Sequence, residues 1–115
     1  MKSKTLFFLT LLTALVSKQA LGHCQVPCGV YTDQLRFEQM LEDQTTIEKA
    51  SKLITELSEK EDALSHQQLS RWVATKEAHA SNIQKTIAEY FMIQRIKATA
   101  KDYDKQLKGA HAVMV

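Results

Sequence analysis

Apolar residues recur every three or four positions through three stretches of the chain. The first stretch contains Phe37, Met40, Leu41, Ile47, Ala50, Ile54 and Leu57. The second contains Leu69, Trp72, Val73, Ala80, Ile83, Ile87, Tyr90 and Phe91, and the third contains Tyr103, Leu107, Ala110 and Met114. This spacing places apolar side chains on one face of an α-helix. It predicts helices over residues 33–60, 65–97 and 102–115.

The signals between these stretches predict how the helices connect. No glycine or proline interrupts the chain from residue 33 to residue 108. Ser65, followed by Gln68, has the spacing of a capping box and predicts that the second helix starts there. Short polar links at residues 61–62 and 99–101 make neighbouring helices antiparallel. We therefore expect an all-α fold, a small up-and-down helical bundle, and self-association, because so short a chain buries little surface.

The first 22 residues have a different pattern from the rest. Two lysines precede a nearly apolar run at residues 5–16, which is shorter than the about 20 apolar residues that a membrane-spanning helix needs. Ala20 and Gly22 place small residues three positions and one position before the bond to His23. This pattern predicts a cleaved signal peptide at residues 1–22, with an uncleaved membrane anchor as the alternative. Cleavage would export the protein to the periplasm or the exterior, without stable membrane association.

Composition narrows the function classes. Without the three lysines of the leader, the chain has twelve basic and thirteen acidic residues, a net charge of −1. A nucleic-acid-binding domain is usually basic, so nucleic acid is not an expected partner. The chain lacks a glycine-rich phosphate loop, which argues against Rossmann and P-loop enzymes. Its two cysteines are too few for a disulfide framework.

The residues with distinctive chemistry gather directly after the predicted cleavage site. The segment reads His23-Cys24-Gln25-Val26-Pro27-Cys28-Gly29-Val30-Tyr31 and holds both cysteines and the only proline. A freed His23 offers an α-amine and an imidazole, Cys24 a thiolate and an ionisable amide, and Cys28 a thiolate. An amine, an amide nitrogen and two thiolates can surround an ion in one plane, an arrangement that suits Ni(II) or Cu(II) better than Zn. Pro27 favours a tight return of the chain, and Gly29 permits a positive φ.

Two other interpretations of this segment stay open on the residues alone. Cysteines in an exported chain often form a disulfide, here between Cys24 and Cys28 in an interaction domain. The segment could also bind nickel or copper in an exported helical module that has no enzymatic activity. The remaining histidines, His66, His79 and His111, have no partner at helical spacing and are expected at the surface or in packing.

The pattern His-Cys-x-x-Pro-Cys-Gly-x-Tyr at a processed N-terminus resembles the nickel hook of the nickel superoxide dismutases. All six fixed positions are filled here. The resemblance implies an enzyme that disproportionates superoxide to dioxygen and hydrogen peroxide with a nickel ion cycling between Ni(II) and Ni(III). It implies that His23 binds nickel through its amine and imidazole, Cys24 through its amide and thiolate, and Cys28 through its thiolate. Residues 1–22, 23–31 and 32–115 would then be leader, nickel hook and helical bundle.

The same resemblance assigns roles around the metal. Tyr31 matches a tyrosine over the open face of the site, and Tyr90 matches a second one. Glu38 matches an acid that orients the imidazole of His23. By the same resemblance, the position of its arginine partner matches His79 in this chain, and Arg71 lies two turns earlier. The family has an acid in place of Gln25, a four-helix bundle and hexameric bacterial members, which implies a homo-oligomer here.

Overall fold

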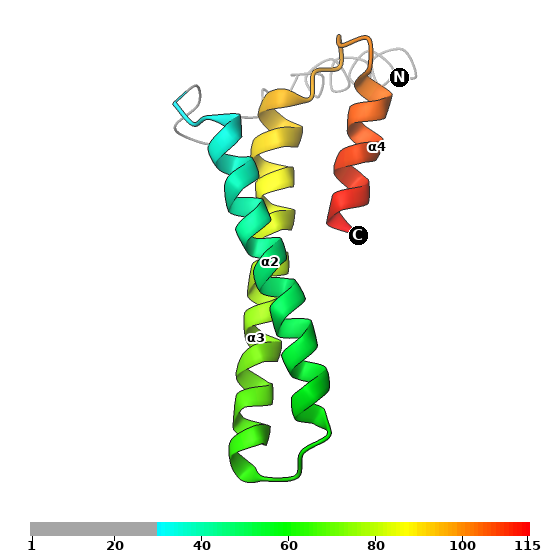
Figure 1. Ribbon diagram of the computed structural model, residues 1–115. Coiled ribbons are helices and arrows are strands. Elements are labelled where there is room, and N and C mark those ends of the chain that lie inside the picture. The colour runs from blue at the N-terminus through cyan, green and yellow to red at the C-terminus, as the bar shows by residue number, and fades with distance from the viewer. Residues whose placement is uncertain (1–29) are drawn as a thin grey trace, which may run out of the picture.

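The computed structural model describes residues 30–115, and these residues form helices joined by short links (Figure 1). The elements are α2 (Asp33–Ser58), α3 (Ala63–Lys85), the π-helix η1 (Thr86–Arg95) and α4 (Tyr103–Met114). No strand occurs in this described part, so the predicted all-α fold is confirmed. The predicted leader and the hook residues up to Gly29 lie outside the described residues.

The start of α2 is fixed by its N-cap, Thr32. Its backbone is extended, and its side-chain oxygen accepts a hydrogen bond from the backbone N–H of Leu35 at 3.4 Å. This contact gives a partner to one of the amides that a helix start leaves free, and Asp33 adds a favourable negative charge in the first turn. The predicted start at residue 33 is therefore confirmed. The helix ends at Ser58, two residues before the predicted end.

The predicted capping box at the start of the second helix is wrong. The N-cap is Asp62, whose carboxylate accepts hydrogen bonds from the backbone N–H of Ser65 at 3.0 Å and from its hydroxyl at 2.5 Å. Ser65 is therefore the third residue of α3, which begins at Ala63. Aspartate is as good an N-cap as serine and also carries the charge that the helix N-terminus favours. These hydrogen bonds from Ser65 lower the pKa of the Asp62 carboxyl.

The second predicted helix is also not one regular α-helix. Its last part, η1, is a π-helix that ends at Arg95, two residues before the predicted end. The backbone N–H of Ile96 donates to the carbonyl of Phe91 at 2.9 Å, which is the five-residue spacing of this helix type. The predicted third helix is confirmed as α4, one residue shorter at each end.

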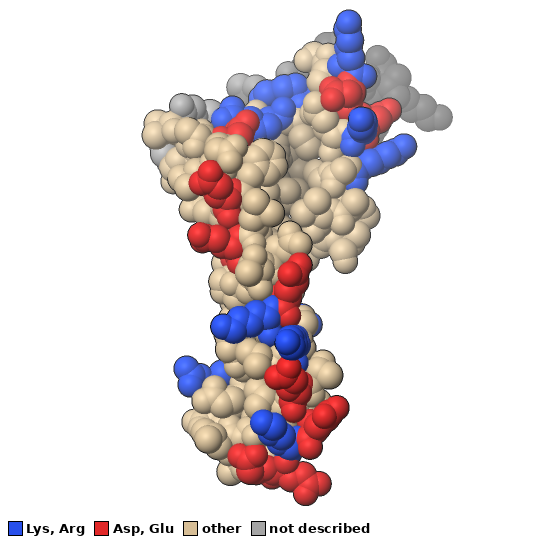
Figure 2. Space-filling view, viewed as in Figure 1, with Lys and Arg blue, Asp and Glu red and all other residues tan. Residues whose placement is uncertain are grey.

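α2, the continuous helix formed by α3 and η1, and α4 pack together only at one end of the molecule. α2 and α3 form a long antiparallel hairpin, and α4 runs back along η1 at the end away from the hairpin turn (Figure 1). The bundle therefore has three helices at that end and two near residues 59–62. In Figure 2 the two-helix part is the narrower one, with charges of both signs along it. None of the helices in residues 30–115 is long and apolar enough to cross a membrane.

The buried core is small because three helices pack together at only one end of the molecule. The buried apolar side chains of the described residues are Ala50, Ile87, Tyr90 and Ala110. They come from all three predicted stripes, so the assignment of the stripes to inner faces is confirmed at these positions. Two members of the first stripe, Phe37 and Leu41, are 49% and 61% exposed because no further helix covers them.

Candidate functional site

The N-terminal end of α2 meets η1 at a pair of tyrosines. Tyr90 is 1% exposed, and its ring centroid lies 6.4 Å from that of Tyr31, just before the α2 cap. The phenol oxygen of Tyr90 lies 3.0 Å from the backbone carbonyl oxygen of Tyr31. The structure thus brings together two residues that the sequence resemblance had assigned to the site, although they lie far apart along the chain.

An aspartate and an arginine complete this tyrosine cluster, which we define as Tyr31, Asp33, Tyr90 and Arg95. The Tyr90 hydroxyl donates to Asp33 Oδ1 at 2.6 Å, and Arg95 Nε donates to the same oxygen at 2.6 Å. Arg95 Nη2 donates to the Tyr90 phenol oxygen at 2.7 Å and reaches the Tyr31 carbonyl at 3.4 Å. The hydrogen bond from Tyr90, and then the hydrogen bond and charge of Arg95, hold the pKa of the Asp33 carboxyl below its ordinary value.

A second arginine lies against the rings of the cluster. The guanidinium carbon of Arg36 lies 4.3 Å from the ring centroid of Tyr31 and 6.0 Å from that of Tyr90. Such placement over an aromatic face is a cation–π contact. Among residues 30–115, the buried Nε of Arg36 has no hydrogen-bond partner. A mostly polar cavity of about 170 Å³ lies here, lined by Tyr31, Arg36, Lys85, Thr86, Glu89 and Tyr90.

Glu38 and His79 each have another hydrogen-bond partner among the described residues. Glu38 is exposed and accepts a hydrogen bond from Gln34 Nε2 at 3.0 Å. His79 Nδ1 instead lies 2.5 Å from Asp43 Oδ1, and Asn82 Nδ2 donates to that same oxygen at 3.4 Å. The Asp43 side chain is 13% exposed and that of His79 33%, so this contact joins α2 to α3 inside the hairpin.

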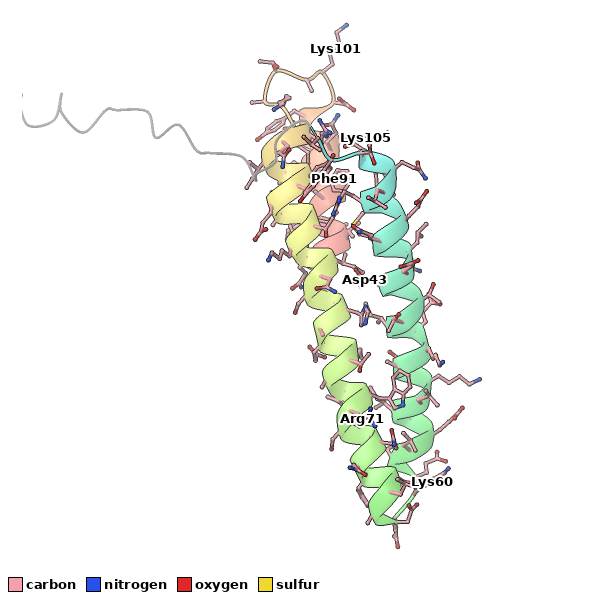
Figure 3. The ribbon with its side chains drawn as sticks, turned by 90° about the vertical axis from the view of Figure 1, so that its left-hand side faces the viewer. Asp43, Lys60, Arg71, Phe91, Lys101 and Lys105 are labelled. Carbon is pink, nitrogen blue, oxygen red and sulfur yellow. The ribbon has the colours of Figure 1, made fainter. Side chains whose placement is uncertain are left out.

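Arg71 lies away from the tyrosine cluster. Figure 3 shows Arg71 toward the hairpin turn that carries Lys60, whereas Phe91, the neighbour of Tyr90, lies at the other end. Arg71 and Trp72 line a cavity of about 320 Å³ there. The structure therefore brings Tyr31 and Tyr90 together but does not bring Arg71 to them. The arginines that do reach the cluster are Arg36 and Arg95.

Sequence analysis had missed Asp33, Arg36 and Arg95 as members of the site. The periodicity of an α-helix places residues five positions apart on different faces, so it separates Arg95 from Tyr90. Asp33 has the sequence position of an ordinary acidic residue in a first helical turn. The one signal in the sequence was weak: Arg36 lies two positions before Glu38, which the resemblance assigns to the site.

The described residues contain no metal site of their own. Among residues 30–115, no group of three or more His, Cys, Asp and Glu side chains could hold a metal ion. The donor set that suits nickel is in the sequence just before them, where His23, Cys24 and Cys28 supply an amine, an imidazole, an amide and two thiolates. By donor chemistry these residues fit nickel, and the chain runs from Cys28 to Tyr31 in three residues.

Comparison with known proteins agrees with this donor chemistry. The family model of nickel-containing superoxide dismutase matches residues 18–115, a range that includes both the hook segment and every described helix. No curated protein and no solved structure matches the chain. Because the match covers most of the sequence, the chain belongs to the family of nickel-containing superoxide dismutases, which are nickel-dependent oxidoreductases.

Proposed function

We propose that residues 23–28 hold the nickel ion with which this superoxide dismutase converts superoxide to dioxygen and hydrogen peroxide. The observation that carries the proposal is the family match over a range that includes the filled hook motif. Nickel, once bound, supplies one-electron exchange with superoxide between Ni(II) and Ni(III).

The ligands that we propose are the α-amine and imidazole of His23, the amide nitrogen and thiolate of Cys24, and the thiolate of Cys28. Anionic thiolate and amide donors stabilise the higher oxidation state of the metal. Pro27 and Gly29 would let the short segment turn back on itself. The α-amine can bind only if His23 is the first residue, so the proposal includes cleavage after Gly22 and export of the mature protein.

The described residues have supporting roles in this proposal. Tyr31 and Tyr90 restrict access to the metal, because the ring of Tyr31, the last residue of the hook, lies against that of Tyr90. Arg36 places a positive charge beside Tyr31 and attracts the superoxide anion. Glu38 orients the imidazole of His23 as a residue outside the ligand set. The contact of His79 with Asp43 shows that His79 already has a carboxylate partner.

The experiment that tests the proposal adds one glycine before His23. We expect mature protein starting at His23 to bind one nickel ion and to dismutate superoxide. The glycine-extended form should lose activity by more than about 100-fold, because the extension converts a ligating amine into an amide. N-terminal sequencing, elemental analysis and a superoxide assay on both forms check this. Equal activity of the two forms would contradict the proposed ligand set.

We further propose that the protein assembles into a homo-oligomer, a hexamer on the pattern of its family. Two adjoining apolar cavities of about 450 and 390 Å³ support self-association. Residues of α2, α3, η1 and α4 line them, and their walls include the exposed side chains of Phe37, Leu41 and Val113. Contact with another copy would remove this apolar surface from water.

A further inference from the structure

Arg95 and Asp33 connect the chain around Tyr31, the last residue of the hook, to η1. Arg95 is the donor of three contacts, to the carboxylate of Asp33, the phenol of Tyr90 and the carbonyl of Tyr31. One of these acceptors is a backbone atom, so the contact with Tyr31 constrains the path of the chain itself. The point that it constrains lies three residues after Cys28.

The π-helix makes this arrangement possible. In an α-helix, residues five positions apart point about 140° away from each other. In η1 the hydrogen bonds span five residues, as between Ile96 and Phe91, and residues five apart lie on the same face. Tyr90 and Arg95 have this spacing, and Arg95 Nη2 lies 2.7 Å from the Tyr90 oxygen. The π-helix therefore places Tyr90 and Arg95 close enough for the hydrogen bond between them.

The count of hydrogen atoms shows why Arg95 is needed. The Tyr90 phenol has one hydrogen but two acceptors in reach, Asp33 Oδ1 at 2.6 Å and the Tyr31 carbonyl at 3.0 Å. The charged carboxylate is the stronger acceptor, so it takes the phenol hydrogen. The Tyr31 carbonyl then depends on Arg95 Nη2 for a donor. Without Arg95, Tyr31 and Asp33 compete for one hydrogen.

We propose that Arg95 and Asp33 are positioning residues of the nickel site: by fixing the Tyr31 carbonyl and the Tyr90 phenol, they hold the tyrosine pair where the hook leaves the bundle. This inference rests on the proposed function, because it takes residues 23–28 as the nickel-binding segment. Neither residue touches the metal or superoxide in this role. Arg95 and Asp33 are 39% and 47% exposed at the side chain, so their replacement leaves the helical core intact.

The test uses mature protein in which His23 is the verified first residue. Arg95→Gln removes the charge but keeps most of the side-chain length, and Arg95→Lys keeps the charge but not the forked donors. Asp33→Asn is the second variant of the cluster. Lys60→Gln is the matched control, because Lys60 is exposed at the far hairpin turn.

The first measurement needs no metal. In the nickel-free protein, ring protons of Tyr31 and Tyr90 should show a nuclear Overhauser effect, since the ring centroids lie 6.4 Å apart and are tilted by 38°. We expect this signal to weaken at least several-fold in Arg95→Gln and Asp33→Asn, to return in part in Arg95→Lys, and to be unchanged in Lys60→Gln.

The second measurement is activity per bound nickel ion. We expect a three- to tenfold loss in Arg95→Gln with unchanged nickel content, partial rescue in Arg95→Lys and no loss in Lys60→Gln. Wild-type signal and wild-type activity in Arg95→Gln would overturn the inference, as would a lost signal with unchanged activity per nickel. Wild-type protein that binds no nickel would contradict the proposed hook, and the metal-free signal separates that failure from failure of the tyrosine cluster.

Discussion

The carboxyl of Asp33 links two other members of the tyrosine cluster, Tyr90 and Arg95. It accepts hydrogen bonds from Tyr90 and Arg95 through a single oxygen, Oδ1, at 2.6 Å each. Both partners favour the ionised form, so the pKa of Asp33 is lowered in the folded protein. Because the side chain is 47% exposed, water screens this stabilisation to the range of exposed ion pairs, below about 1 kcal/mol.

The lowered pKa of Asp33 makes a prediction about pH. A carboxyl with a lower pKa in the folded state stabilises the fold above its unfolded pKa of about 3.9, and this contribution is lost as the pH falls through the folded value. We therefore expect Asp33→Asn to be less stable than wild type at pH 7, with a difference that shrinks as the pH falls below the unfolded pKa of about 3.9. Urea unfolding of both nickel-free proteins at several pH values measures this. A difference that stays the same from pH 7 down through the acid range would show that the charge of Asp33 is not the cause.

At the scale of the helices, apolar spacing and capping residues predicted the positions of the helices. They were less reliable for the N-cap residue of α3 and for the helix type of η1. The start of α2 at residue 33 follows from Thr32, and the end of α4 lies within one residue of its predicted position. The start of α3 was wrong because Asp62 and Ser65 are both good capping residues, and the sequence does not say which one adopts the extended backbone of a cap. The π-helix was missed because apolar spacing alone does not distinguish a π-helix from an α-helix over ten residues.

The cap of α3 gives a prediction about stability. Asp62→Ala removes the acceptor for the Ser65 amide and should lower the free energy of unfolding by about 1 kcal/mol. Asp62→Asn keeps an acceptor oxygen and should lose less. Gln68→Ala, at the position of the rejected capping box, should change stability by less than about 0.5 kcal/mol. Chemical denaturation measures the free energy of unfolding of the three variants and of wild type. A larger loss in Gln68→Ala than in Asp62→Ala would restore the capping box.

The whole molecule is an incompletely covered hairpin. α4 packs against η1 and α3 only at the end of the hairpin away from its turn (Figure 1). Apolar side chains near it stay exposed. The stripe of α2 was correctly predicted as apolar, yet apolar character did not make Leu41 buried. An apolar stripe predicts which face of a helix packs inward. The number of neighbouring helices that contact this face decides how much of it is buried.

This exposed surface gives a prediction about assembly. Leu41 is 61% exposed and lines the larger apolar cavity, so Leu41→Lys should shift the assembled protein toward smaller species. Leu64→Lys is the control, since Leu64 is 65% exposed at the start of α3, far from that cavity. Sedimentation analysis of both variants and wild type measures the assembly. If wild type sediments as a monomer at tens of micromolar, self-association through this surface is wrong.

The sequence by itself determined the three apolar stripes and the donor chemistry of residues 23–28, because both depend on residues close together along the chain. It also carried the family, which the match over residues 18–115 confirms. Only the tertiary structure decided that Asp33 and Arg95 join Tyr31 and Tyr90, and that His79 contacts Asp43. The contacts between different elements join residues that are 36 to 64 positions apart in the sequence. Their formation depends on how α2 packs against α3 and η1, and a local pattern does not contain that information.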